Sequence, residues 1–204
     1  MLAKQYGIQI FASEGTWRAM RTKFTHTKNL IPVQLPGGAF YIGNLCVEPF
    51  ALSHDAAEPV GYVFDCGGCK AAVATDTGYV SRGMIRALEG VQSIVLESNH
   101  DPDMLQNGPY PYVLKKRVAS RKGHLSNADC ARVLAHLAQH GLTQAYLGHL
   151  SQQNNDPQLA LSVSRAALLD AGVDPDRTFQ LQVAAPQCFT CDTAVTLSAA
   201  ALRR

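Results

Sequence analysis

The sequence predicts a layered α/β protein. Short apolar runs typical of strands alternate with segments whose apolar residues recur at helical spacing. Polar turns that carry histidine or aspartate follow several of the apolar runs, as expected where strands end at one edge of a sheet. The chain has 204 residues, 47% of them apolar, which is enough for one domain with a substantial core. We therefore expect residues 1–204 to form a single domain.

The first half of the chain should contain mainly strands. The segment 22–39 is polar and holds two prolines and two glycines, so we expect it to be a loop. Gly67-Gly68 is typical of a two-residue hairpin turn, which lets residues 71–74 pair back on the preceding strand. The other expected elements are a helix at 14–21 and strands at 8–12, 40–50, 62–64 and 93–96.

Helices in the second half are marked by their caps. Residues 127–140 carry apolar side chains at helical spacing, after a Ser126 and Asp129 pair that resembles a capping box. Asp156-Pro157 is typical of a helix start, and Gly172 should end that helix. Strands are expected at 144–147 and 178–184.

Three polar turns carry candidate metal ligands. His54, Asp76 and His149 each follow an apolar run, so their side chains could converge at one sheet edge. Imidazole and carboxylate ligands suit zinc, manganese or iron, and such ions activate water for hydrolysis. Taken singly, each residue is more simply a capped or core histidine or a turn aspartate. Taken together, the three favour a metal site.

Charge and composition exclude several classes. The net charge of +2 does not indicate a nucleic-acid binder by its global field, and no stretch is long and apolar enough to cross a membrane. The first ten residues lack the layout of a secretion signal, so we expect a cytoplasmic protein.

The cysteines give only weak support for a structural zinc site. The pairs Cys66/Cys69 and Cys188/Cys191 lie too far apart in sequence for a zinc ribbon. We interpret the first pair as flanking the Gly67-Gly68 turn, although a structural zinc held by all four thiols stays open.

One basic cluster stands immediately before His124. Without it the rest of the chain is net negative, so the positive charge is local. Such a patch suits a phosphate backbone, while the simpler alternative is a solvated helix face. Tyr110 and Tyr112, just upstream, could stack on bases but more simply pack in a proline-bounded turn. The cluster consists of Lys115, Lys116, Arg117, Arg121 and Lys122.

Another histidine pair, His136 and His140, has the one-turn spacing that metal sites use. No partner is visible in the sequence, so we interpret both as surface residues of a helix. His26, in the polar loop, has no assigned role.

Six polar motifs follow one another along the chain. They are Ser53-His54-Asp55, Thr75-Asp76-Thr77-Gly78, Glu97-Ser98-Asn99-His100-Asp101, Gly108-Pro109-Tyr110-Pro111, Gly123-His124-Leu125-Ser126-Asn127, and His149-Leu150-Ser151 with Asn154-Asn155. Their order and spacing resemble the YycJ/WalJ-like branch of the metallo-β-lactamase-fold hydrolases, which is related to tRNase Z. The resemblance runs roughly from residue 3 to residue 184.

That resemblance implies a four-layer αββα sandwich with two divalent metal ions, zinc or manganese, between its sheets. By likeness to the family, His54 would bind one metal, His149 the other, and Asp76 both. Glu97 and His124 resemble the glutamate and histidine that act together as proton donor in the tRNase Z branch. The implied activity is a phosphodiesterase, most simply a 5′-to-3′ exonuclease acting on DNA.

One family motif, His-x-His-x-Asp-His, is absent from these residues. We therefore expect a copy that lacks N-terminal strands and is depleted of metal. Two alternatives to a DNA exonuclease stay open: a hydrolase of small phosphodiesters or thioesters, and an inactive fragment with a binding role only. The native metal, the polarity and strandedness of the substrate, and the oligomeric state are not set by the sequence.

Overall fold

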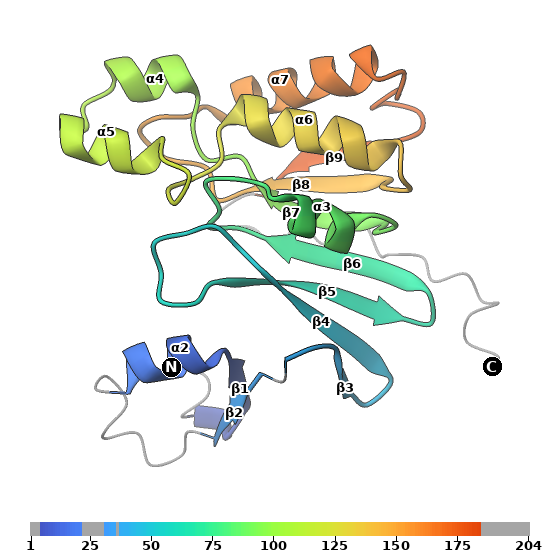
Figure 1. Ribbon diagram of the computed structural model, residues 1–204. Coiled ribbons are helices and arrows are strands. Elements are labelled where there is room, and N and C mark those ends of the chain that lie inside the picture. The colour runs from blue at the N-terminus through green and yellow to red at the C-terminus, as the bar shows by residue number, and fades with distance from the viewer. Residues whose placement is uncertain (1–4, 22–30, 36, 185–204) are drawn as a thin grey trace.

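A mixed seven-stranded sheet forms the body of the protein (Figure 1). The computed structural model describes residues 5–21, 31–35 and 37–184. The strands lie in the order β3-β4-β5-β6-β7-β8-β9; the pairs from β3 to β6 are antiparallel, and those from β6 to β9 are parallel. Their bounds are Phe40–Ile42, Leu45–Ala51, Val60–Cys66, Cys69–Ala74, Ser93–Glu97, Gln144–Gly148 and Gln180–Val183.

Five helices follow the strands of the large sheet. The parallel strands need crossover connections, and helices provide them. Ser81, Asp101, Ser126 and Asp156 cap four of these helices by accepting hydrogen bonds from backbone N–H groups of the first turn. The helices are α3 (Arg82–Leu88), α4 (Pro102–Asn107), α5 (Tyr112–Val118), α6 (Asn127–Ala138) and α7 (Pro157–Asp170).

The core lies between one face of the sheet and helices α3, α6 and α7, which Figure 1 shows on the same side of it. Alternate residues of the central strands point into this layer, so Ile94, Leu96, Ala145 and Leu147 are almost completely buried. On the opposite face of the sheet, four residues that pair across neighbouring strands are more exposed than these core residues. They are Tyr62, Val73, Val95 and Tyr146.

A smaller unit lies beside β3 and β4 (Figure 1). It consists of the parallel pair β1 (Gln9–Ala12) and β2 (Ile31–Gln34) with helix α2 (Glu14–Met20). Phe11 stacks on Phe40 with ring centroids 5.1 Å apart, and Gly15 N–H donates to Glu58 Oε2 at 2.6 Å. These contacts join the unit to the large sheet.

The layered α/β fold is confirmed, and several expected elements differ in detail. Residues 31–34 form β2 instead of loop, because pairing with β1 overrides a proline-containing sequence at a sheet edge. Helices α3, α4 and α5 are additional to the expected elements. The Gly67-Gly68 hairpin is confirmed: both glycines have positive φ, and Cys66 is the register partner of Cys69. Cys188, Cys191 and His26 lie outside the described residues. No described helix combines the length and hydropathy needed to span a bilayer.

Candidate metal centre

Three acidic or imidazole side chains stand at the carboxyl ends of neighbouring parallel strands. Glu97 is the last residue of β7, Asp76 follows β6 by two positions, and His149 directly follows β8. The register pairs Ala74 with Leu96 and Glu97 with Gly148, so these strand ends lie level with one another. The expectation that Asp76 and His149 meet at one sheet edge is thus met by the geometry.

His54 reaches the same edge from the loop after β4. Because β4, β5 and β6 pair antiparallel in succession, β4 runs in the direction of β6 and ends at the same side. His54 Nδ1 is 2.9 Å from the carbonyl oxygen of Gly123, and His54 Nε2 is 3.9 Å from Asp76 Oδ1. A carbonyl only accepts hydrogen bonds, so Nδ1–H donates, and Nε2 is the ring nitrogen on the side of Asp76.

Asp76 Oδ1 is the point where three imidazoles meet. It lies 3.7 Å from His124 Nδ1 and 3.5 Å from His149 Nδ1, in addition to its approach to His54. The ring centroids of His54 and His124 are 4.9 Å apart, and those of His124 and His149 are 5.1 Å apart. The side chains of the three histidines therefore form a continuous row beside one carboxylate.

Glu97 is the buried anchor of this row. Its side chain has no solvent exposure, and one oxygen, Oε1, lies 2.8 Å from His124 Nδ1 and 2.6 Å from His149 Nδ1. The second oxygen accepts from the backbone N–H of Thr77 at 2.7 Å. The contact with His124 agrees with the pairing that the family resemblance implies. The contact with His149 is one the sequence does not indicate.

Ionisation at the centre follows from these contacts. Burial by itself would raise the pKa of Glu97, but hydrogen bonds from His124, His149 and Thr77 outweigh it and leave that pKa lowered. The pKa of His149 is raised, mainly by its hydrogen bond to Glu97. Without a metal ion, the arrangement thus favours a carboxylate beside a protonated imidazole.

Backbone strain is concentrated at two candidate ligands. Asp76 and His149 are the non-glycine residues of the described chain with positive φ, at 59° and 56°. Left-handed backbone costs a non-glycine residue on the order of 1–3 kcal/mol, and it persists where the surroundings fix it. Both residues stand just beyond the end of a strand, and His149 Nδ1 lies 3.5 Å from Asp76 Oδ1.

A buried amide network holds the loop that carries His149. Asn99 Nδ2 donates to the carbonyl of His149 at 2.8 Å. Asn155 Nδ2 lies within 3.0 Å of the carbonyls of Ser98 and Asn99 and of Asn127 Oδ1. These asparagines belong to the polar motifs of the sequence, but the sequence alone does not indicate their role. Their signal is weak, because an asparagine after a strand is equally common in turns.

Two glycines allow the loop of His124 to pack closely. A Cβ on Gly78 would lie 2.4 Å from the carbonyl oxygen of Ser120, and one on Gly123 would lie 2.2 Å from that of Arg117. Ser53 Oγ donates to the carbonyl of Arg121 at 2.7 Å. These approaches bring the turns after β4, β6 and α5 together.

The basic cluster has several distinct environments. Arg117 lines a cleft of about 390 Å³ beside His124 and His149, and its guanidinium holds Asp55 through contacts of 2.5 and 3.1 Å. Lys116 lies over the ring of Tyr112 and Arg121 over that of Tyr79, whereas Lys115 donates to the carbonyl of Gln106.

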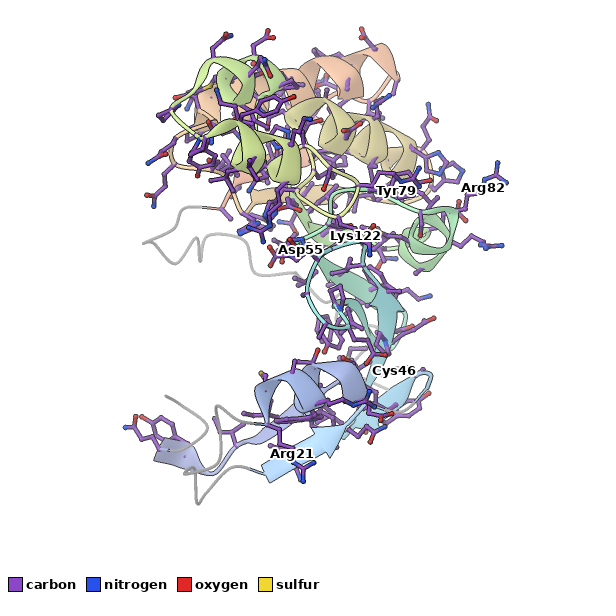
Figure 2. All side chains as sticks on the ribbon, turned by 60° about the vertical axis from the view of Figure 1, so that its left-hand side comes forward. Arg21, Cys46, Asp55, Tyr79, Arg82 and Lys122 are labelled. Atoms are coloured by element: carbon purple, nitrogen blue, oxygen red, sulfur yellow. The ribbon has the colours of Figure 1, made fainter. Side chains whose placement is uncertain are left out.

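Figure 2 shows Asp55 and Lys122 at the junction of the loop after β4 with the loop before α6. Lys115, Lys116, Arg121 and Lys122 are not among the described residues that line the cleft. Tyr110 lines it, whereas Tyr112 is 67% exposed under Lys116.

Comparison with known families decides what kind of centre this is. Residues 1–150 match the family model described as the beta-lactamase superfamily domain. The chain belongs to this superfamily. This membership confirms the family resemblance and, with it, the expectation of a hydrolase.

Curated relatives of this superfamily chain carry nuclease names. A protein named exodeoxyribonuclease YycJ, from Bacillus anthracis, is 38% identical over 196 residues, covering 93% of this chain and 72% of that protein. One named exodeoxyribonuclease WalJ, from Streptococcus pneumoniae, is 36% identical over 184 residues, covering 86% of this chain and 67% of that protein.

Solved structures show the same fold at low sequence identity. The metallo-β-lactamase fold protein YhfI from Bacillus subtilis matches with a TM-score of 0.65 at 14% identity, over 90% of this chain and 66% of that one. Zn²⁺-bound PqqB from Methylobacterium extorquens matches with a TM-score of 0.59 at 17% identity, over 90% and 62%. The chain thus spans just under two thirds of the length of these structures.

Superfamily membership implies divalent metal ions, and the residues at the centre fit them. Asp76, Glu97, His124 and His149 offer ligand atoms that all lie within 4.8 Å of one another, and His54 reaches Asp76 from outside that group. Imidazole nitrogen with carboxylate oxygen is a donor set for zinc and manganese. The hydrogen bond from His54 Nδ1 to Gly123 is the kind of support that orients metal-ligating histidines.

Proposed function

We propose that this chain carries the catalytic centre of a metal-dependent phosphodiesterase that degrades DNA as a 5′-to-3′ exonuclease. The observation that carries the proposal is the position of Asp76 Oδ1, within 4 Å of a nitrogen of His54, His124 and His149. The nuclease names of the two curated relatives support the choice of DNA. We further propose that residues 1–204 belong to one domain and that the protein acts in the cytoplasm.

In this proposal His54 and His149 each bind one of two metal ions, zinc or manganese, and Asp76 binds both. When bound, the ions would supply an activated water and neutralise charge on the phosphate. The chain's own part is orientation: Gly123 fixes the ring of His54, while Glu97 and Asn99 fix His149 and its loop.

His124 is the proposed proton donor. Its Nδ1 contacts Glu97, so its Nε2 is the atom that can give a proton to the departing oxygen. His124 lines the cleft together with Arg117 and Tyr110, where a nucleotide could lie. The basic cluster would contact phosphates along the strand, with Arg117 nearest to the centre and Lys115, Lys116, Arg121 and Lys122 farther out.

The test is turnover of end-labelled DNA and of bis-p-nitrophenyl phosphate by protein loaded with Mn²⁺ or Zn²⁺. Asp76→Ala should lose turnover and the metal bound at this centre. His124→Ala should keep the metal and lose about 10²- to 10⁴-fold in kcat, the usual contribution of a general acid. Arg132→Gln, at an exposed position of α6 away from the centre, controls for a surface substitution.

Other outcomes select the alternatives. Cleavage of the small diester without DNA degradation would indicate a hydrolase of small phosphodiesters. Absence of both metal and turnover in the folded protein would indicate a role in binding only. Normal turnover by His124→Ala would remove this residue from the mechanism.

A further inference from the structure

Two histidines and a glutamate meet at the opposite edge of the sheet from the candidate metal centre. His136 lies in the last turn of α6, His140 just beyond that helix, and Glu89 at the C-cap of α3. Glu89 leads into β7 and His140 into β8, so the cluster stands at the amino ends of these strands. The sequence shows the histidine pair alone, and the fold supplies the missing carboxylate.

The ligand atoms of this cluster are already close. His136 Nε2 is 3.5 Å from Glu89 Oε1, and one ligand atom of each residue lies within 4.8 Å of the other two. The imidazoles of His136 and His140 stack with centroids 4.3 Å apart. The backbone N–H of Gly90 donates to the carbonyl of His140 at 3.1 Å, which ties the two turns together.

Both imidazoles present a nitrogen that can bind a cation. His140 Nδ1 is 2.7 Å from the carbonyl of His136, so Nδ1–H donates and Nε2 is the ring nitrogen left for a metal ion. His136 Nε2 is shielded from solvent and makes no hydrogen bond to any described residue. Its neighbour is Glu89 Oε1, and a metal ion held between the two atoms would bind both.

Electrostatics favours a positive ion at this place. Helices α3 and α6 both end here, and a helix carries partial negative charge at its C-terminus. The carboxylate of Glu89 adds to that potential.

We propose that Glu89, His136 and His140 form a second metal site, separate from the centre at the strand ends, for a divalent transition metal of the zinc class. Two imidazole nitrogens and one carboxylate oxygen are zinc ligands, and water completes the tetrahedron. Zinc–ligand bonds of about 2.0–2.2 Å require ligand atoms roughly 3.3 Å apart, which rotation of the exposed Glu89 and His140 side chains provides. A bound ion joins α3 to α6 and stabilises the folded chain, because the unfolded chain does not hold the three ligands together.

Zinc alone is the probe that tests the site. Stoichiometry and affinity are measured by competition with a chromophoric chelator for the wild type, Glu89→Gln, His140→Gln and Asp76→Ala. The first two variants should each lose one tightly held Zn²⁺ per chain, with affinity at this site weakened by more than the roughly 10- to 100-fold that loss of a supporting hydrogen bond costs. Asp76→Ala should keep that ion. Arg132→Gln, one turn earlier on α6, is the matched control and should bind as the wild type does.

A second measurement reports on the residues themselves. Diethyl pyrocarbonate modifies accessible histidines, and peptide mass spectrometry identifies them. Zinc should protect His140, whose side chain is exposed, in the wild type and in Asp76→Ala, but not in Glu89→Gln. This readout is independent of nuclease activity, so it separates failure of the proposed function from failure of the second site. Unchanged zinc stoichiometry in Glu89→Gln and in His140→Gln, or an unprotected His140 in the wild type at saturating zinc, overturns the proposal.

Discussion

His149 Nδ1 lies 2.6 Å from Glu97 Oε1, and the same oxygen is 2.8 Å from His124 Nδ1. One fully buried carboxylate oxygen therefore joins the proposed proton donor to a proposed metal ligand. Because the other oxygen is held by the N–H of Thr77, Glu97 cannot turn to serve one histidine without straining its contact with the other. Substitution of Glu97 should disturb both roles at once.

The stability of the metal-free protein should reflect this contact. The pKa of Glu97 is lowered from 4.5, so its contribution is fully present above pH 4.5 and is lost as the pH falls through the lower folded value. The pKa of His149 is raised from 6.5, so its contribution is fully present below pH 6.5 and is lost as the pH rises through the higher folded value. Both contributions coincide between about pH 4.5 and 6.5. Thermal unfolding with chelator should show the largest Tm advantage over Glu97→Gln in that window; a constant difference from pH 3 to 9 would contradict this.

The left-handed backbone of Asp76 leads to a paired prediction. Asp76→Gly and Asp76→Ala both remove the carboxylate, so both should lose the metal of the centre at the strand ends equally. Glycine adopts a φ of 59° without the clash that a Cβ makes, so Asp76→Gly should be more stable than Asp76→Ala by about 1 kcal/mol. Urea unfolding of the metal-free proteins measures the difference. Equal stabilities would mean that this backbone is not strained in solution.

The sequence predicts where residues at strand ends lie, because the apolar pattern that marks a strand is local in the sequence. His54, Asp76 and His149 each follow an apolar run, and the parallel or twice-antiparallel pairing brings those ends together. Contacts between distant loops carry no local signal. The pairing of Asp55 with Arg117, 62 residues apart, depends on how the turn after β4 meets α5. The partner of His136 likewise appears only when α3 and α6 end side by side.

Strand β2 is a second case in which a long-range contact decides the local structure. Its sequence contains a proline and predicts a loop, whereas pairing with β1 makes the segment extended. The contacts of a side chain are harder to predict than its place in the chain. The family resemblance pairs Glu97 with His124, but the contact of Glu97 with His149 depends on how β8 lies beside β7.

Close packing at Gly78 should be essential for the His124 loop. A Cβ there would meet the carbonyl oxygen of Ser120 at 2.4 Å, and backbone cannot rotate away as a side chain can. Gly78→Ala should therefore cost about 1–3 kcal/mol in the free energy of unfolding. Gly83→Ala is the matched control, because the nearest neighbour of an added Cβ is Ser81 Oγ at 3.6 Å and the site lies in the first turn of α3, so this substitution should not destabilise the protein. Urea unfolding of both variants gives the comparison, and two neutral substitutions would contradict the tight approach.

The ion pair between Asp55 and Arg117 should restrain DNA binding. In the free protein the guanidinium at the cleft is neutralised by a carboxylate, and the pKa of Asp55 is lowered by that hydrogen bond. Asp55→Asn removes a charge that repels phosphate and releases Arg117 to contact it. Binding of a labelled single-stranded oligonucleotide to metal-free protein should tighten several-fold, and the plot of log K against log salt should steepen by about 0.7, the value of one added phosphate contact.

Asp170→Asn, at the end of α7, makes the same change of charge away from the cleft and should leave the slope unaltered. Two results would show that Arg117 does not contact phosphate. One is that Asp55→Asn binds the oligonucleotide no more tightly than Asp170→Asn does. The other is that adding Arg117→Gln to Asp55→Asn leaves the tighter binding unchanged.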